Sequence, residues 1–204
     1  MKSLLFFKVN WWLFVIPVVL MSCQKNKDEV ARDYASTVLV QDSVQSVSTQ
    51  NSEMQQMIEK GIVLDRARSI FSMVRYNTMS TGGAPMGDLF DRAYCSKSWN
   101  KMLMQVRCKE EETATLFFEI EHWTMTREPG IVTFDDFEVS RLSMDSIMTA
   151  SVNFVAYSAD SYTPARIDMV YEDGRWVIDN FHDLKYKLNA RESMKYYLRK
   201  EDVI

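Results

Sequence analysis

The stretch that decides the fold is Arg166–Phe181, RIDMVYEDGRWVIDNF. Apolar residues recur at every second position on both sides of Asp173-Gly174, which is typical of two short β-strands joined by a tight turn. A two-residue turn of this kind needs positive φ angles, and Asp-Gly supplies them. The resulting register pairs Tyr171 with Trp176, so one face of this hairpin is apolar and aromatic.

The same register pairs Met169 with Ile178 and places Asp168 directly opposite Asp179 on the other face. Like charges in this position destabilise a sheet. Paired carboxylates can also do acid–base work when burial separates their pKa values. Because Arg166 shares the face of the two acids, the pattern favours a solvated outer face over a catalytic pair.

The alternation extends upstream of the hairpin. Residues 149–156 place alanine, valine and phenylalanine side chains on one face, and a further strand is expected over about 132–142. Together with the hairpin, these segments predict an antiparallel sheet with one apolar face. That face needs a cover, because burying apolar surface is the main favourable term in folding.

Helical spacing of apolar residues dominates the first half of the chain and supplies this cover. It predicts one or two amphipathic helices over 53–76, followed by a loop over 77–85. Ser96 is a good N-cap for a further helix, and Asn189 with Glu192 forms a capping box for a last one. The sequence therefore predicts an α+β domain, with N-terminal helices packed on a curved antiparallel sheet and a C-terminal helix.

The N-terminus has the layout of a secretory signal. Lys2 and Lys8 give it a positive start, and Trp11–Leu20 is an uninterrupted apolar run. This run is shorter than the roughly 20 apolar residues that a membrane-spanning helix needs. We therefore expect export of the chain rather than a membrane span.

The end of this segment, Leu20-Met21-Ser22-Cys23, resembles the lipobox of bacterial lipoproteins. The resemblance implies that residues 1–22 are a signal peptide and that Cys23 is lipidated. Several acyl chains hold a protein to a membrane much better than one chain does. Gln24, rather than aspartate, follows the cysteine, which by the same resemblance implies the outer membrane, with the protein facing the periplasm or the cell surface.

Composition limits the remaining organisation. Residues 23–52 are rich in Ser, Gln, Asp and Val and are expected to form a tether, which leaves 53–204 as one domain with a sizeable core. The chain has 24 basic and 28 acidic residues, a net charge of −4. This balance argues against a nucleic-acid binder that relies on bulk positive charge.

The two cysteines of the domain, Cys95 and Cys108, belong to an exported chain in which disulfides can form. A helix between them would hold them about 19 Å apart, beyond the reach of a disulfide. The apolar spacing over 96–106 is helical, so two buried free thiols are expected. A reversal of the chain within that segment would instead allow the bond.

The hairpin also carries a family resemblance. Arg166–Phe181 resembles the closing hairpin of the nuclear-transport-factor-2-like superfamily, the curved half-cone shared with ketosteroid isomerase and SnoaL-type proteins. Tyr94–Asn100, Glu121–Trp123 and Ser193–Tyr197 are similar to a group of bacterial lipoproteins with that fold and no assigned activity. The resemblance covers about residues 55–200. It implies that Glu121–Trp123 borders the open end of the cone.

These expectations select candidate binding residues. Glu121, His122 and Trp123 follow from the resemblance, and Tyr171 and Trp176 follow from the aromatic face of the hairpin. The acids near Trp123 could offer oxygen ligands to a cation, but their spacing is not that of a calcium loop. We therefore expect a solvated loop, with neither a metal nor a cofactor; the acids are Glu119, Glu121, Glu128, Asp135 and Asp136.

The histidines are the remaining catalytic candidates, and there are two, His122 and His182. No nucleophile elbow, zinc-binding motif or phosphate-binding glycine loop accompanies them. The sequence therefore predicts a non-enzymatic binding module for a small ligand or a protein partner. Two alternatives stay open: a lyase or isomerase that uses a histidine and a nearby acid in the cone, and an immunity or inhibitor protein that covers a toxin or enzyme.

Overall fold

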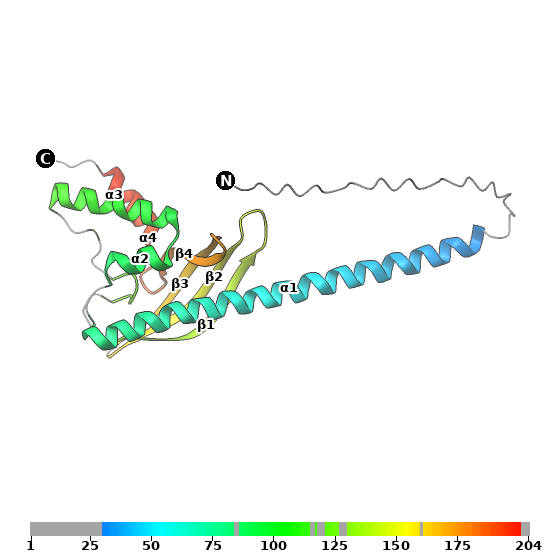
Figure 1. The fold of residues 1–204 in the computed structure, drawn as a ribbon, viewed down its shortest axis with the longest axis horizontal. Helices are drawn as coiled ribbons and strands as arrows, with labels where there is room; N and C mark the ends of the chain where they lie inside the picture. Colours follow the sequence, from blue (N-terminus) through cyan, green and yellow to red (C-terminus); the bar gives the residue numbers. More distant parts are fainter. Residues whose placement is uncertain are drawn as a thin grey trace, which may run out of the picture. The chain divides into compact units, whose positions relative to one another are not determined.

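The computed structural model describes residues 30–83, 86–114, 117, 121–126, 130–159 and 161–200. The chain forms two units, residues 1–48 and 49–204, and the second unit is the folded domain. Figure 1 shows its elements in chain order: α1 (Val30–Thr81), α2 (Asp88–Tyr94), α3 (Lys97–Thr113), β1 (Thr133–Ser143), β2 (Thr149–Ser158), β3 (Ser161–Glu172), β4 (Arg175–Asp183), β5 (Leu188–Asn189) and α4 (Ala190–Arg199). The α+β class that the sequence predicts is confirmed.

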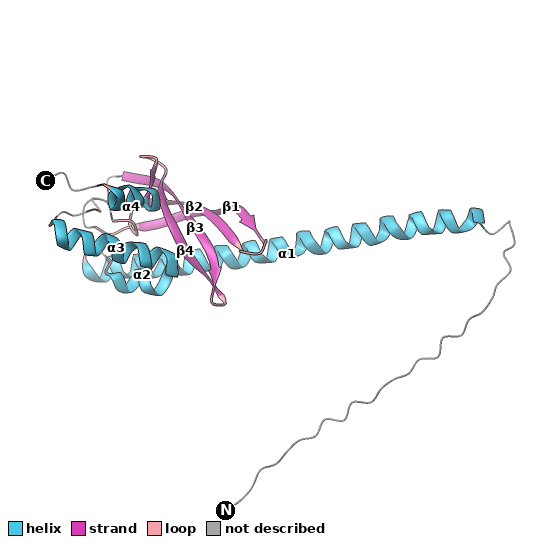
Figure 2. Cartoon of the chain, turned by 90° about the horizontal axis from the view of Figure 1, so that it is seen from above, coloured by secondary structure: helices cyan, strands magenta, loops and turns pink. Residues whose placement is uncertain are grey.

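The strands form one curved antiparallel sheet in the order β1-β2-β3-β4-β5, so each strand pairs with its neighbours in sequence (Figure 2). The predicted hairpin is confirmed: Tyr171 lies opposite Trp176 in the β3–β4 pair. Asp173 and Gly174 at its tip have φ angles of 52° and 79°. These positive angles explain why Asp-Gly closes this turn.

A β-bulge corrects the second half of the predicted register. Asp168 lies opposite Asn180 rather than Asp179, because β4 contains one extra residue at this point. With unbroken alternation, Asn180 would face the core and Phe181 would face water. The bulge instead places Phe181 opposite Ile167, with 2% of the phenylalanine exposed. Burying this ring favours the shifted register.

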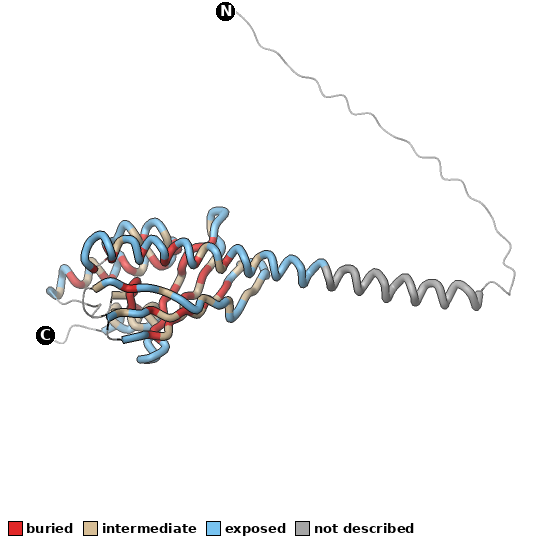
Figure 3. Tube along the Cα trace, turned by 90° about the horizontal axis from the view of Figure 1, so that it is seen from below, coloured by how far each residue is buried: buried red, intermediate tan, exposed pale blue. Residues whose placement is uncertain are grey.

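The core lies between the apolar face of the sheet and the helices. Phe71 of α1 is 1% exposed, and its ring contacts three phenylalanines of the sheet and the indole of Trp123. Figure 3 shows buried segments along both α1 and the strands of this domain. The inward positions of β2 are the alternating ones that the sequence predicts: Ala150, Val152, Phe154 and Ala156.

Helix α1 is longer than expected. It runs without a break through 53–76, and it includes the first residues of the segment 77–85 that we expected to be a loop. Residues 30–52, expected as a tether, are helical as well. Gly83 follows the helix with a φ of 87°, and a Cβ there would collide with the backbone of Gly130, so a glycine is required.

The N-terminal residues that carry the predicted signal peptide and Cys23 lie outside the described part of the chain. Within the part that is described, no helix combines the length and the apolar character needed to cross a membrane.

The cysteines are both free, as the helical spacing predicts. Cys95 is buried just before α3, and burial together with the carboxylate of Asp91 raises the pKa of its thiol well above the ordinary value. Cys108 is exposed, so the expectation that it is buried is wrong. It falls between the buried positions of α3, Val106 and Glu110, and therefore faces solvent.

Candidate functional site

The structure separates the sequence-predicted site residues into two groups. His122 and Trp123 lie in a tight turn whose ends, Glu121 and Thr126, form a single antiparallel bridge. Tyr171 and the buried Trp176 lie at the tip of the β3–β4 hairpin, where their rings are in edge contact. Glu119 and Glu128 lie outside the described residues.

His122 is part of a buried polar cluster centred on Asp91 of α2. One carboxylate oxygen of Asp91, Oδ1, accepts hydrogen bonds from Nε2 of His122 and Nε1 of Trp99, both at 2.9 Å. The side chains of Asp91 and His122 are 2% and 7% exposed. Burial alone would raise the pKa of Asp91, but the hydrogen bonds from His122 and Trp99 lower it below the ordinary value.

The other members of this turn also face inward or are half-buried. Trp123 is fully buried and packs against Phe71, Phe90 and Phe181. Burial raises the pKa of Glu121. The structure therefore places these residues in the packed interior, and their contacts are those of a core.

Across the ranges that the structure describes, no group of three or more His, Cys, Asp and Glu side chains could hold a metal ion. Asp136 has a φ of 58° and accepts a hydrogen bond at 3.3 Å from the hydroxyl of Tyr157, in an exposed position.

The opposite face of the sheet carries a groove with a volume of about 630 Å³, which we call the polar groove. It lies on this face because Thr149 and Ser151 of β2 alternate with core residues. Its floor comes from β2 and β3, and α3 and β4 supply one wall. The polar groove is lined by Ser96, Ser98, Ser140, Arg141, Ile147, Thr149, Ala150, Ser151, Arg166, Asp168, Met169, Val170, Glu172 and Asp179.

A chain of hydrogen bonds crosses the floor of the polar groove. Ser151 Oγ donates to Asp168 Oδ1 at 2.8 Å, and His182 Nε2 donates to Asp168 Oδ2 at 2.6 Å. Arg166 Nη2 lies 3.1 Å from His182 Nδ1, and Asn180 Nδ2 lies 3.0 Å from His182 Nε2. These side chains thus fix one another's orientation.

The carboxylate of Asp168 is held in its ionised form. Burial acts to raise its pKa, but the hydrogen bonds from His182 and Ser151, and the charge of Arg166, lower it below the ordinary value. Asp183 follows His182 directly in the sequence. In the structure Asp183 accepts a hydrogen bond from the backbone N–H of Tyr186 at 2.9 Å.

The bulged residue Asp179 anchors the wall of the polar groove. Its carboxylate accepts a 2.5 Å hydrogen bond from Ser96 Oγ and is bonded to the guanidinium of Arg191. The hydroxyl of Ser96 also caps α3, accepting the N–H of Trp99 at 2.9 Å. Arg191 belongs to α4, so this carboxylate joins the starts of two helices to the sheet.

This arrangement fixes the polar groups that a ligand in the polar groove would meet. The hydroxyl of Ser151 donates to the carboxylate of Asp168 and not to the imidazole of His182. A carboxylate with a lowered pKa is also a weak base. What the polar groove offers a ligand is a set of fixed hydroxyl, carboxylate and guanidinium groups.

No protein family, curated protein or solved structure matches this chain. The function proposed below therefore rests on the geometry of the described residues and on the sequence of the N-terminus.

Proposed function

We propose that this protein is an exported, lipid-anchored binding module of the cell envelope that takes a small polar ligand in the polar groove. The domain is of the nuclear-transport-factor-2-like type, and Cys23 ties it to the outer membrane. The observation that carries the proposal is the groove itself. Its volume of about 630 Å³ falls within the range of roughly 300–1,000 Å³ that is usual for ligand sites.

The fixed side chains of the polar groove support binding. Asp168 is hydrogen-bonded through both oxygens, and Asp179 is held by two partners. Side chains that are already ordered lose little conformational entropy when a ligand arrives, which favours affinity. Arg141 at the edge is exposed and can meet an acidic or hydroxyl group of the ligand.

The packing of the other face also supports this location. Phe71, Phe154 and Met169 fill the space that an enclosed pocket on the core side of the sheet would occupy. An isomerase or lyase would need an accessible acid or base there. His122 and Asp91 are instead buried against each other, and neither lines the polar groove or the two smaller cavities beside β4.

The ligand site is tested by filling the polar groove. Thr149→Trp places an indole on its floor and is expected to weaken binding about tenfold or more. The measurement is ligand-observed NMR with a library of polar metabolites and short oligosaccharides, using the full-length lipoprotein. Thr133→Trp is the matched control, because Thr133 is also an exposed strand threonine but lies outside the groove. Equal binding by both variants would overturn the proposal.

The anchor is tested by the mass of the mature chain from native membranes. We expect an N-terminal Cys23 that carries a diacylglyceryl group and an amide-linked acyl chain. Cys23→Ser is expected to remove both additions and to leave the precursor uncleaved, because the thiol is the atom that is alkylated. A membrane-derived chain that starts elsewhere and carries no lipid would contradict this prediction.

A further inference from the structure

Three arginines surround the outer edge of β4 near the hairpin tip: Arg66 of α1, Arg92 of α2 and Arg175 of β4. Within the described ranges, none of the three forms an ion pair with an acid. Arg107, Arg166 and Arg191, by contrast, are each paired with a carboxylate. These three guanidinium groups therefore keep their positive charge without an ion pair among the described residues, although the whole chain is acidic.

Arg175 lies where two cavities adjoin. One has a volume of about 320 Å³ and is mostly apolar, with Ile62, Met148, Tyr171 and Trp176 in its walls and Arg66 beside them. The other has a volume of about 290 Å³ and contains Arg92. Arg175 lines both cavities, so the apolar recess shares a border with one that contains both basic and acidic side chains.

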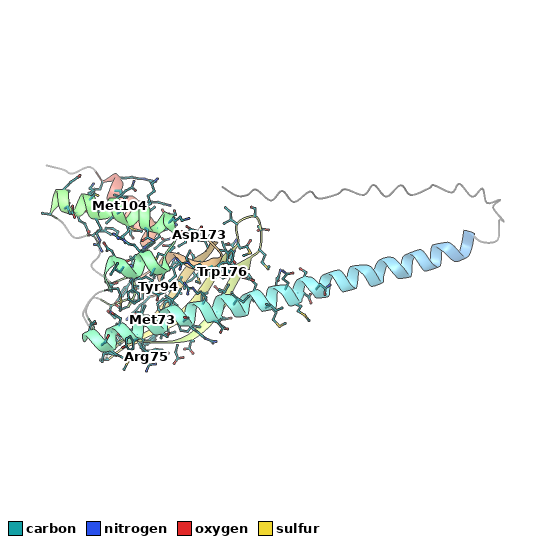
Figure 4. All side chains as sticks on the ribbon, in the orientation of Figure 1. Met73, Arg75, Tyr94, Met104, Asp173 and Trp176 are labelled. Atoms are coloured by element: carbon teal, nitrogen blue, oxygen red, sulfur yellow. The ribbon has the colours of Figure 1, made fainter. Side chains whose placement is uncertain are left out.

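The recess near Arg66 is built from side chains in fixed positions. Arg66 Nε donates to the carbonyl oxygen of Trp176 at 3.1 Å, and its guanidinium lies 5.7 Å from the ring centre of Tyr94. Trp176 Nε1 donates to Glu59 Oε1 at 2.7 Å. Figure 4 labels Tyr94, whose ring lies beside the guanidinium of Arg66, and Trp176, whose carbonyl oxygen accepts its hydrogen bond.

The acids close to the arginines are already engaged. Glu59, the carboxylate of the apolar cavity, accepts the indole N–H of Trp176. Glu172 and Asp173, in the second cavity, lie 3.6 and 2.8 Å from the ammonium of Lys97. Burial, followed by the like charge of Arg175, lowers the pKa of Arg66. An anion between them would relieve this repulsion.

We infer that this is a second binding site, for a small amphiphilic carboxylate of the fatty-acid type. Arg66 and Arg175 bind its carboxylate, with Arg92 adding positive charge, and its hydrocarbon chain lies against Ile62, Met148, Tyr171 and Trp176. Guanidinium groups bind carboxylates with two parallel hydrogen bonds. A cavity at the small end of the range for ligand sites favours a short or medium chain.

The experiment uses a decanoate analogue with a photoreactive diazirine on its chain, added to the full-length lipoprotein in lipid nanodiscs. We expect labelling of the segments that contain Met148 and Tyr171, with competition by decanoate but not by decanol or acetate. The exposed Tyr186 on the same molecule reports non-specific labelling. The methyl ester of the probe has the same chain without the charge, and it is expected to label the cavity about tenfold less.

Variants separate the charge from the fold. Arg175→Gln, at an exposed position, is expected to reduce labelling about tenfold, and Arg175→Lys to reduce it less. Arg199→Gln, another exposed arginine, should have no effect. Thr149→Trp should also leave labelling unchanged, so failure of the polar groove and failure of this site are distinguishable. Equal labelling by acid and ester, or no effect of Arg175→Gln, would show simple partitioning of the chain and overturn the inference.

Discussion

Replacing Asp91 with alanine is expected to lower the free energy of unfolding by about 3–5 kcal/mol, because it removes one partner of a buried polar pair. His122 would keep a buried imidazole without its carboxylate, and the indole N–H of Trp99 would lose its acceptor. Chemical denaturation of the full-length protein, followed by tryptophan fluorescence, measures the change. Asp88→Ala is the control, since that carboxylate is 51% exposed and should cost at most about 1 kcal/mol.

The same pair predicts a dependence on pH. The pKa of Asp91 is lowered in the folded state, because hydrogen bonds from His122 and Trp99 outweigh the opposing effect of burial. The contribution of Asp91 to the free energy of unfolding is therefore complete above the ordinary aspartate pKa. It is lost as the pH falls through the lowered pKa of the folded state. Wild type should lose stability below about pH 4, and Asp91→Asn should lose less over the same range. Parallel acid curves for the two proteins would refute this assignment.

Replacing Phe71 with alanine is the second change with a large expected effect, a loss of about 3–5 kcal/mol. The ring is 1% exposed and contacts aromatic rings from β1, β2 and the turn that contains Trp123, so no single neighbour can fill the cavity. Denaturant titration again measures the change. Tyr76→Ala on the same helix, where 68% of the residue is exposed, should stay within about 0.5 kcal/mol.

The parts of the fold that depend on local pattern could be predicted from the sequence. Strict alternation predicted the inward residues of β2, and Asp173-Gly174 predicted the turn. Strand alternation and turn type both depend only on residues that are close in the sequence. Ser96 and Asn189 cap α3 and α4 as expected, because a cap needs only its own first turn.

The bulge at Asp179 could not be predicted in the same way. Its presence depends on the balance between burying Phe181 and keeping a regular ladder, which is set by the packing of the whole domain. Without the bulge, the hydrogen bonds of the polar groove could not be predicted. The bulge brings His182 to Asp168 and leaves Asp179 to bind Ser96. A clue was present, since an asparagine preceding a phenylalanine in β4 conflicts with an unbroken apolar face.

The buried cluster was missed for a different reason. Asp91 and His122 are 31 residues apart and belong to a short helix and a tight turn, neither of which has a pattern that pairs them. The arginines around β4 come from three elements, and only tertiary structure brings them together. Sequence pattern describes single elements well, whereas sites assembled from several elements depend on how those elements pack.

The extra residue in β4 also affects how related chains should be compared. Between the hairpin tip and Asp179, the even-numbered residues of β4, such as Trp176 and Ile178, lie on the core side of the sheet. Beyond Asp179 the alternation is reversed, and the odd-numbered Phe181 lies on the core side. A homologue that lacks this insertion would align without visible error and yet have every side chain from Asn180 to Asp183 assigned to the wrong layer. Alignments of such chains therefore need a one-residue gap at this position, and a gap there would itself mark which homologues can build the floor of the polar groove.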